Sequence, residues 1–228
     1  MRKRGSSMDI QGMIFDMDGT LLDSMGMWRT IFPDYFSRYV SPEQAEAHMA
    51  EAETMNMDTS LALFVKTYSV PATVQELKRG LIARAKEGYA AQKLLPGAKG
   101  FLDQVAAAHI PMAIASCTEL ELVNYALDCF GLTGYFDAVF SASMGYPSKS
   151  SPDIYLAAAE ALGTDPGVTL VAEDALVAAA SAKGAGFETL GLHWPSSRFS
   201  PQDMGEVCDV VLTCGWPGVT FDALRSLS

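Results

Sequence analysis

The chain has 228 residues, of which 49% are hydrophobic and 19% charged, a composition that excludes long disorder and allows a sizeable core. Its formal net charge of −11 disfavours binding to nucleic acid or to an anionic membrane, because like charges repel. No apolar run reaches the roughly 18 residues that a membrane-spanning helix needs. A globular protein that binds neither nucleic acid nor membrane is expected.

The first residues, MRKRGSSM (1–8), form the one basic cluster and are expected to be a flexible tail. They do not resemble a signal peptide, because no long apolar segment follows them. The four cysteines, Cys117, Cys129, Cys208 and Cys214, include no C-x-x-C pair and have no histidine cluster near them, so a zinc site is weakly supported. Reduced thiols and a cytoplasmic location are the expectation.

Short apolar runs bounded by turn signals predict strands at residues 11–15, 110–116, 138–143, 168–173, 188–192 and 208–213. Several runs are apolar throughout, which is typical of strands covered on both faces. Helical patterns lie between them, at residues 119–132, 151–163 and 175–186. In the second of these, Ser151 is the expected N-cap, Pro152 the first helical residue and Gly163 the terminator. The alternation predicts a doubly wound, Rossmann-like α/β core with a mainly parallel sheet.

One segment breaks this alternation, because from residue 24 to residue 95 the patterns are helical and no clear strand is found. Thr73 and Glu76 have the spacing of a capping box at the start of one of these helices. We expect residues 24–95 to form a helical cap domain inserted into a core domain made of residues 9–23 and 96–228. Placed directly after the first strand, the cap would cover the crevice where such sheets bind ligands.

Acids, a hydroxyl, a thiol and a lysine follow the carboxyl ends of the first four predicted strands: Asp16 and Asp18, Ser116 and Cys117, Lys149, and Glu173 and Asp174. In doubly wound folds these ends share one edge of the sheet, so the side chains are expected to converge. Carboxylates held close repel each other, and a hard cation such as Mg²⁺ relieves that repulsion. A hydroxyl and a lysine opposite them suit phosphate oxygens. An aspartate can also attack phosphorus and form an aspartyl-phosphate.

Four motifs in order resemble those of the haloacid dehalogenase superfamily of phosphotransferases. They are DMDGT (16–20), Ser116 at the end of IPMAIAS, Lys149 in KSSPDIYL, and VAEDALVAAASAKGAG (171–186). The helical insertion just after the first motif resembles the subgroup that includes β-phosphoglucomutase and phosphoglycolate phosphatase. One motif alone is weak, whereas four in order, across residues 9–215, are specific.

The resemblance implies roles for the residues of the first and third motifs. Asp16 is the expected nucleophile. Asp18 is expected to protonate the leaving oxygen and then to activate water, and both aspartates are expected to bind Mg²⁺, Asp18 through its backbone carbonyl. Thr20 is expected to fix the geometry of the aspartate loop at the substrate-binding site. Lys149 is expected to neutralise charge on Asp16 and on the phosphate.

The resemblance also implies roles for the second and fourth motifs. Ser116, Cys117 and nearby backbone N–H groups are expected to bind the phosphoryl oxygens. Asp174 is the expected direct ligand of Mg²⁺, and Glu173 is expected to support it or to bind through water. The chain departs from the familiar pattern at Cys117, which stands where Asn, Ser or Gly is more usual.

The expected reaction is hydrolysis of a small phosphate monoester. Dehalogenases of the superfamily lack the second aspartate, so Asp18 argues against that activity, and Thr20 stands where β-phosphoglucomutases usually carry valine. A sugar-phosphate mutase, a phosphonoacetaldehyde hydrolase using a cap lysine, and a non-catalytic binding protein stay open. Trp28 and Arg29 are near the hinge of the cap and His193 follows the fifth strand, and each is a candidate for substrate contact. The identity of the phosphorylated metabolite and the oligomeric state do not follow from the sequence.

Overall fold

The core contains a single parallel sheet. The structure, a computed structural model, describes residues 8–52 and 55–226. Its strands are β1 (Gly12–Phe15), β2 (Met112–Ser116), β3 (Ala138–Ser141), β4 (Thr169–Glu173), β5 (Glu188–Leu192) and β6 (Val210–Leu212). They pair in parallel in the order β3-β2-β1-β4-β5-β6. All the predicted strands are therefore confirmed, with ends that move by at most two residues.

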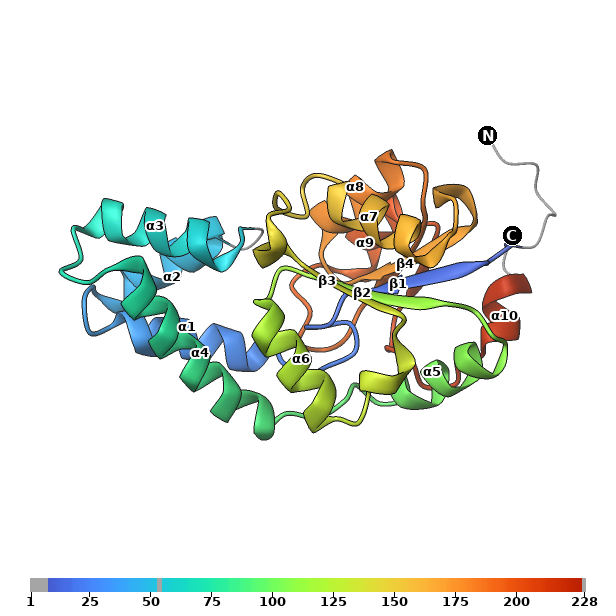
Figure 1. Cartoon of the computed structure of the whole chain (residues 1–228), viewed down its shortest axis with the longest axis horizontal. Helices are drawn as coiled ribbons and strands as arrows, with labels where there is room; N and C mark the ends of the chain where they lie inside the picture. The colour runs from blue at the N-terminus through green and yellow to red at the C-terminus, as the bar shows by residue number, and fades with distance from the viewer. Residues whose placement is uncertain (1–7, 53–54, 227–228) are drawn as a thin grey trace.

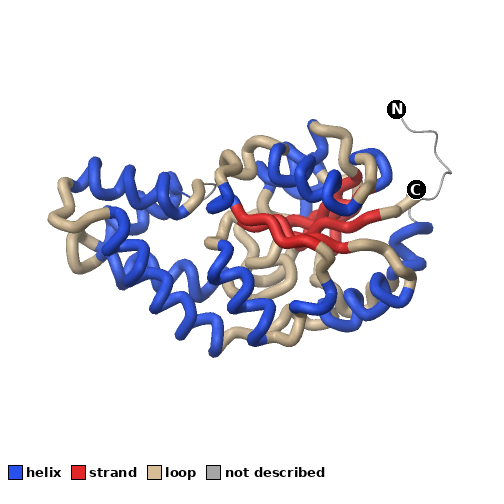
Figure 2. The backbone as a smooth tube through the Cα atoms, in the orientation of Figure 1, coloured by secondary structure: helices blue, strands red, loops and turns tan. Residues whose placement is uncertain are grey.

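The sheet forms the central layer, with helices on both of its faces (Figure 2). Strands β1, β2 and β4 are buried along their whole length, which explains why their sequences are apolar throughout. Phe15, at the end of β1, pairs with Ile114 of β2 and with Ala172 of β4. The residues that follow these three strands therefore emerge side by side at one edge of the sheet.

The helices of the core are α5 (Ala98–Ala107), α6 (Leu120–Cys129), α7 (Asp153–Leu162), α8 (Leu176–Gly184), α9 (Pro201–Val207) and α10 (Phe221–Ser226). Helices α7, α8 and α9 cover one face of the sheet, and α5, α6 and α10 lie on the other (Figure 1). Short 3₁₀ turns occur at Thr133–Tyr135, Ala142–Met144 and Pro166–Val168. The predicted doubly wound α/β fold is confirmed.

The start of α7 differs from the prediction. The helix begins at Asp153 with Pro152 as its N-cap, so the predicted start at Pro152 with Ser151 as the cap was wrong by one residue. The physical reason is that the Ser151 hydroxyl donates to the Asp153 carboxylate, and it caps no backbone N–H of the helix. The predicted end is confirmed, because Gly163 follows the helix with a φ of 68°.

The cap segment contains four helices: α1 (Met25–Phe36), α2 (Pro42–Ala52), α3 (Met57–Tyr68) and α4 (Val74–Ala90). They lie beyond the carboxyl ends of the strands (Figure 1). Helix α4 begins with the predicted capping box of Thr73 and Glu76. Leu77, Leu81 and Ala85 of α4 are fully buried at a spacing of four residues, which is one face of a helix. The division of the chain at residues 24 and 95 stays a prediction.

Polar contacts join the cap to the core on two sides. Lys78 of α4 pairs with Glu119 at the start of α6 at 3.0 Å, and Lys86 of α4 pairs with Glu121 of α6. On the other side, Nη2 of Arg29 on α1 donates to the carbonyl of Ser196, in the loop after β5, at 2.6 Å. These contacts place the cap helices above the edge where the strands end.

The N-terminal end of the described chain differs from the predicted flexible tail. Met8, expected in the flexible tail, is buried, and its N–H donates to the carbonyl of Arg225 at 2.9 Å. The rest of the predicted tail lies outside the described residues.

Among the described helices, none combines the length and the apolar character needed to cross a membrane.

Candidate active site

A cavity of about 600 Å³ lies between the carboxyl edge of the sheet and the cap. The residues predicted to form the site that line it are Asp16, Asp18, Ser116, Cys117, Lys149, Glu173 and Asp174. They come from four segments that are far apart in the sequence, and the parallel sheet brings them to one place. Thr20 is the one predicted site residue that does not line the cavity.

Lys149 lies between two of the acids. Its Nζ donates to Oδ1 of Asp16 at 2.5 Å and to Oε1 of Glu173 at 2.6 Å. The hydroxyl of Tyr155, on α7, also donates to Oε1 of Glu173 at 2.6 Å. Burial opposes the charge on Lys149, but Asp16 and Glu173 outweigh it and hold the pKa of Lys149 well above its ordinary value. The lysine is therefore a permanent cation at the bottom of the cavity.

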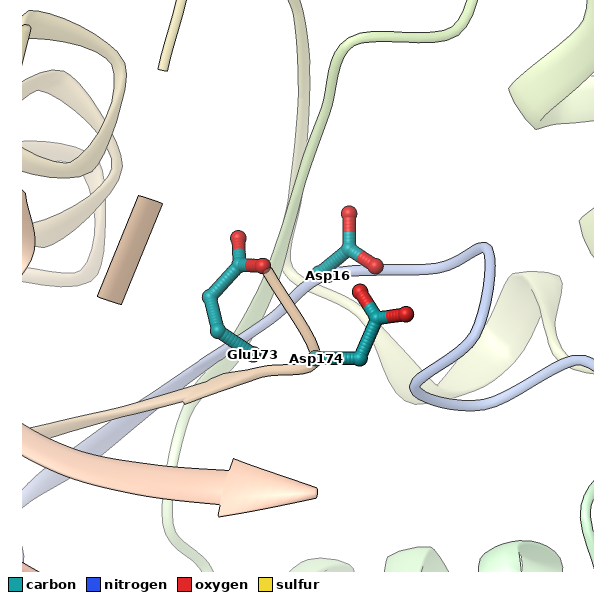
Figure 3. A group of neighbouring side chains, drawn as sticks. All are labelled: Asp16, Glu173 and Asp174. Carbon is teal, nitrogen blue, oxygen red and sulfur yellow. The ribbon is translucent and has the colours of Figure 1, made fainter. Parts of the chain in front are cut away.

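Three carboxylates form a group that fits a hard cation. One oxygen from each of Asp16, Glu173 and Asp174 lies within 4.8 Å of the others, at the ends of β1 and β4 (Figure 3). Oδ2 of Asp16 and Oε2 of Glu173 are buried and have no hydrogen-bond partner among residues 8–52 and 55–226. Burial and then the neighbouring carboxylates raise the pKa of Asp174 well above its ordinary value. Burial likewise raises the pKa of Glu173 to about 7, against the opposing effect of Lys149. Unpartnered oxygens in such a group suit Mg²⁺.

Asp18 is surrounded by hydroxyl groups instead of cations. Its carboxylate accepts hydrogen bonds from Ser24 at 2.5 Å, from Thr118 at 2.7 Å, and from Tyr89 at 2.7 and 2.9 Å. Burial raises the pKa of Asp18 and nearby Asp16 adds to this, while the hydroxyls act in the opposite direction. A carboxyl group with a raised pKa suits a residue that must hold a proton and then give it up.

Tyr89 joins Asp18 to helix α4 of the cap, and the effect of its removal should be measurable. It is a fully buried residue of α4. In Tyr89→Phe, Asp18 loses one of its donors and is less firmly oriented, so we expect kcat to fall about tenfold, a fraction of what a general acid contributes. Steady-state kinetics with a phosphate monoester measure this. Tyr39→Phe, at an exposed position of the cap, is the matched control. Equal kcat values for the wild type, Tyr89→Phe and Tyr39→Phe would show that Tyr89 has no role in the reaction.

The loop that follows β1 packs closely against Asp174 at Gly19. This residue has a φ of 90°, and a Cβ there would collide with the carboxylate of Asp174. Glycine thus meets both a backbone and a steric requirement. Thr20, next to it, is fully buried, and its carbonyl accepts from Nε1 of Trp216 at 2.8 Å. Thr20 does not line the cavity, and its buried Oγ1 has no hydrogen-bond partner among the described residues, so its role in fixing the loop stays a prediction.

The end of β2 supplies small polar groups. Ser116 is buried, lines the cavity, and its Oγ accepts from the backbone N–H of Thr118 at 3.0 Å. Cys117 is half-buried beside it. Burial raises the pKa of the Cys117 thiol, although Lys149 opposes the shift, so the side chain is a neutral thiol at neutral pH. This supports a small lining residue over a redox-active one.

Sequence patterns did not point to several residues around the acids. Tyr89 and Tyr155 come from helices, and nothing but their place in an amphipathic pattern marks them in the sequence. The loop after β5 also lines the cavity through Ser197, Arg198 and Phe199. His193 begins this loop, and its Nδ1 lies 3.0 Å from the carbonyl of Phe199. His193 therefore helps to hold the loop, and it is not among the residues that line the cavity.

Several known proteins are similar to this chain in sequence or in fold. Fructose-1-phosphate phosphatase YqaB of Escherichia coli (strain K12) is 28% identical over 183 residues, which cover 78% of this chain and 94% of that protein. Hexitol phosphatase A of the same organism is 29% identical over 192 residues, covering 83% and 86%. The crystal structure of CbbY from Rhodobacter sphaeroides in complex with phosphate has a TM-score of 0.79 at 23% identity, covering 94% of this chain and 99% of that chain. At that identity the structure shows the fold alone.

A family model also matches this chain. The model of the haloacid dehalogenase-like hydrolases matches residues 10–186, which is more than half of the chain and includes all four motifs. The predicted enzyme class agrees with this description and with the two relatives, which are both named as phosphatases. The chain belongs to the haloacid dehalogenase-like hydrolase family, as its motifs predicted.

Proposed function

We propose that this hydrolase is a phosphatase, which removes the phosphoryl group of a small phosphorylated metabolite through an aspartyl-phosphate at Asp16. The observation that carries the proposal is the shared cavity. The cavity is lined by Asp16, Asp18, Ser116 and Lys149, and the ammonium group of Lys149 forms an ion pair with the carboxylate of Asp16. A nucleophile, an acid, a hydroxyl and a cation are the groups that phosphoryl transfer through a carboxylate requires.

The reaction proceeds in two displacements. A carboxylate oxygen of Asp16 attacks phosphorus, the bond from phosphorus to the leaving oxygen breaks, and Asp18 gives its proton to that oxygen. The alcohol departs and the phosphoryl group stays on Asp16. Asp18, now ionised, takes a proton from water, whose oxygen attacks phosphorus and releases inorganic phosphate. Asp16 and protonated Asp18 are restored, and one water has been consumed.

The remaining residues bind and orient. Lys149, with its raised pKa, offsets negative charge as the carboxylate of Asp16 approaches the phosphate. Ser116, which lines the cavity, would bind a phosphoryl oxygen. Asp16, Asp174 and Glu173 would hold Mg²⁺ together with the backbone carbonyl of Asp18. When bound, the cation supplies charge that screens the repulsion between the carboxylates and the phosphate.

The relatives guide the choice of substrates. YqaB is named for fructose 1-phosphate and two others for hexitol phosphates, and a further relative, from Thermotoga maritima, is a phosphorylated carbohydrates phosphatase. Phosphorylated carbohydrates are therefore the first class to test. The cytoplasmic location stays a prediction, and the oligomeric state is an open question.

Release of inorganic phosphate from a panel of sugar phosphates, with Mg²⁺ or with EDTA, tests the proposal. We expect turnover with Mg²⁺ and a loss of at least about a hundredfold in EDTA, because the carboxylates then lack their screening cation. Added Mg²⁺ should restore the rate. A panel that includes a sugar bisphosphate separates the alternatives, since isomerisation without phosphate release would indicate a mutase. No reaction of folded protein with any sugar phosphate or with p-nitrophenyl phosphate would indicate a binding protein.

A further inference from the structure

The two ends of the cavity differ in chemistry. The end formed by the core carries the acids and Lys149. The end formed by the cap is lined by apolar side chains, chiefly Met25, Trp28, Phe32, Met49, Met55 and Met57. A cavity of about 600 Å³ has room for a leaving group beyond the phosphoryl group, and that group would lie against the cap. Methionine and aromatic side chains favour a flat apolar surface over a chain of hydroxyls.

Hydrogen-bonding side chains are scarce at the cap end. Among the described cap residues that line the cavity, those with hydrogen-bonding side chains are Trp28, Arg29 and Ser60. The indole N–H of Trp28 donates to the hydroxyl of Tyr89. Nη2 of Arg29 donates to the carbonyl of Ser196, so this side chain fastens the cap to the core. Ser60, on α3, is 4% exposed, and its Oγ lies 3.1 Å from Nε2 of His48 on α2. Ser60 is therefore the hydroxyl that the middle of the cap presents to the cavity.

His48 holds that hydroxyl in one orientation. The imidazole is 2% exposed and packs among the rings of Phe36, Phe64 and Tyr68, with centroids 5.7, 5.0 and 6.4 Å away. Burial lowers the pKa of His48, so the ring is neutral at neutral pH. This contact uses one hydrogen-bonding position of the Ser60 hydroxyl, which leaves further hydrogen-bonding capacity on a residue that lines the cavity.

We propose that the cap end of the cavity is a subsite for a leaving group with a flat, apolar ring and one hydrogen-bonding group, which Ser60 recognises and His48 orients. The subsite rests on the proposed phosphatase function, since it assigns the part of the substrate that leaves. An open-chain polyol would bury several hydroxyls against methionine and aromatic side chains without partners, which disfavours it. The preferred substrate thus differs from the hexitol phosphates for which two relatives are named.

Three esters of primary alcohols test the subsite, because their leaving oxygens are chemically alike. They are benzyl phosphate, 3-(hydroxymethyl)benzyl phosphate and sorbitol 6-phosphate, assayed with Mg²⁺. We expect kcat/KM for the hydroxymethyl compound to exceed that for benzyl phosphate about tenfold and that for sorbitol 6-phosphate about a hundredfold. A preference for sorbitol 6-phosphate would overturn the subsite. So would no turnover of any of the three by protein that hydrolyses p-nitrophenyl phosphate.

Variants of Ser60 and His48 test whether these two residues cause the preference for the hydroxymethyl compound over benzyl phosphate. In Ser60→Ala and in His48→Phe, the ratio of kcat/KM for the hydroxymethyl compound to that for benzyl phosphate should fall from about ten to about one, and the double variant should lose no more, since the two act as a unit. Ser60→Thr, which keeps a hydroxyl, should keep the ratio above that of Ser60→Ala. An unchanged ratio in Ser60→Ala would overturn the role of Ser60, whether or not His48→Phe folds.

A variant of the core separates the two proposals. Asp16→Asn should abolish hydrolysis of all three esters. If this variant still hydrolyses them, the phosphatase mechanism fails. If it is inactive while the wild type prefers the polyol, the subsite alone fails.

Discussion

Asp16→Asn is expected to reduce phosphatase turnover by at least about a thousandfold, because an amide cannot form the acyl phosphate that a nucleophilic carboxylate forms. The substitution keeps the size of the side chain and leaves an oxygen to accept from Lys149. The fold should therefore be retained, and Mg²⁺ should still stabilise the protein against heat. Phosphate release with Mg²⁺, together with a thermal unfolding curve, measures both effects.

Asp165→Asn is a matched control for this experiment, because Asp165 is an exposed residue of the loop before β4. Its turnover should equal that of the wild type. Asp16→Asn protein that retains more than a few per cent of wild-type turnover would contradict the assignment of the nucleophile. If Asp16→Asn lost both its turnover and its thermal unfolding transition, misfolding would explain the loss of turnover. Asp16→Glu, which keeps the charge, would then distinguish misfolding from loss of the nucleophile.

Lys149→Met is expected to reduce both activity and stability. Lys149 is 4% exposed and pairs with two carboxylates, so its removal leaves buried negative charge without a partner. Breaking such a buried pair lowers the free energy of unfolding by about 3–5 kcal/mol. The loss should be smaller at pH 5 than at pH 8, because burial raises the pKa of Glu173 to about 7, so this carboxyl group is protonated at pH 5 and leaves no unpaired charge there. Denaturant unfolding at the two pH values measures this.

Lys183→Met provides the control for that measurement. Lys183 pairs with Asp209 at 3.2 Å, but both side chains are substantially exposed, at 44% and 31%. Exposed pairs contribute about 0–1 kcal/mol, so the free energy of unfolding should change little. Similar losses in the two lysine variants would contradict the view that burial of the ion pair makes Lys149 important.

Much of the core could be predicted because its signals are local. Strands β1, β2 and β4 are buried on both faces, so each appears as an unbroken apolar run in the sequence. Parallel strands end at one edge, and this rule predicts that Asp16, Ser116 and Asp174 lie close together. The capping box of Thr73 and Glu76 was recognisable for the same reason, since its partners are three residues apart.

The surroundings of the acids could not be predicted, because they depend on how helices dock. Tyr89 and Asp18 are 71 residues apart, and their contact depends on the position of α4 above the sheet. Tyr155 reaches Glu173 from α7, whose rotation is set by packing on the sheet. The buried carbonyl of Thr20 accepts a hydrogen bond from Trp216, almost two hundred residues later in the chain. None of these contacts leaves a periodic signal in the sequence.

The central claim is that a phosphoryl group is carried on Asp16, and mass spectrometry of Asp18→Asn tests it most directly. This variant lacks the base that activates water, while p-nitrophenol leaves without needing an acid, so p-nitrophenyl phosphate should load the enzyme and leave it loaded. After mixing with Mg²⁺ and quenching in acid, the account predicts one phosphoryl group per chain, on the peptide that contains Asp16. A phosphoryl group on another residue, or steady release of p-nitrophenol with no phosphate on the protein, would contradict it.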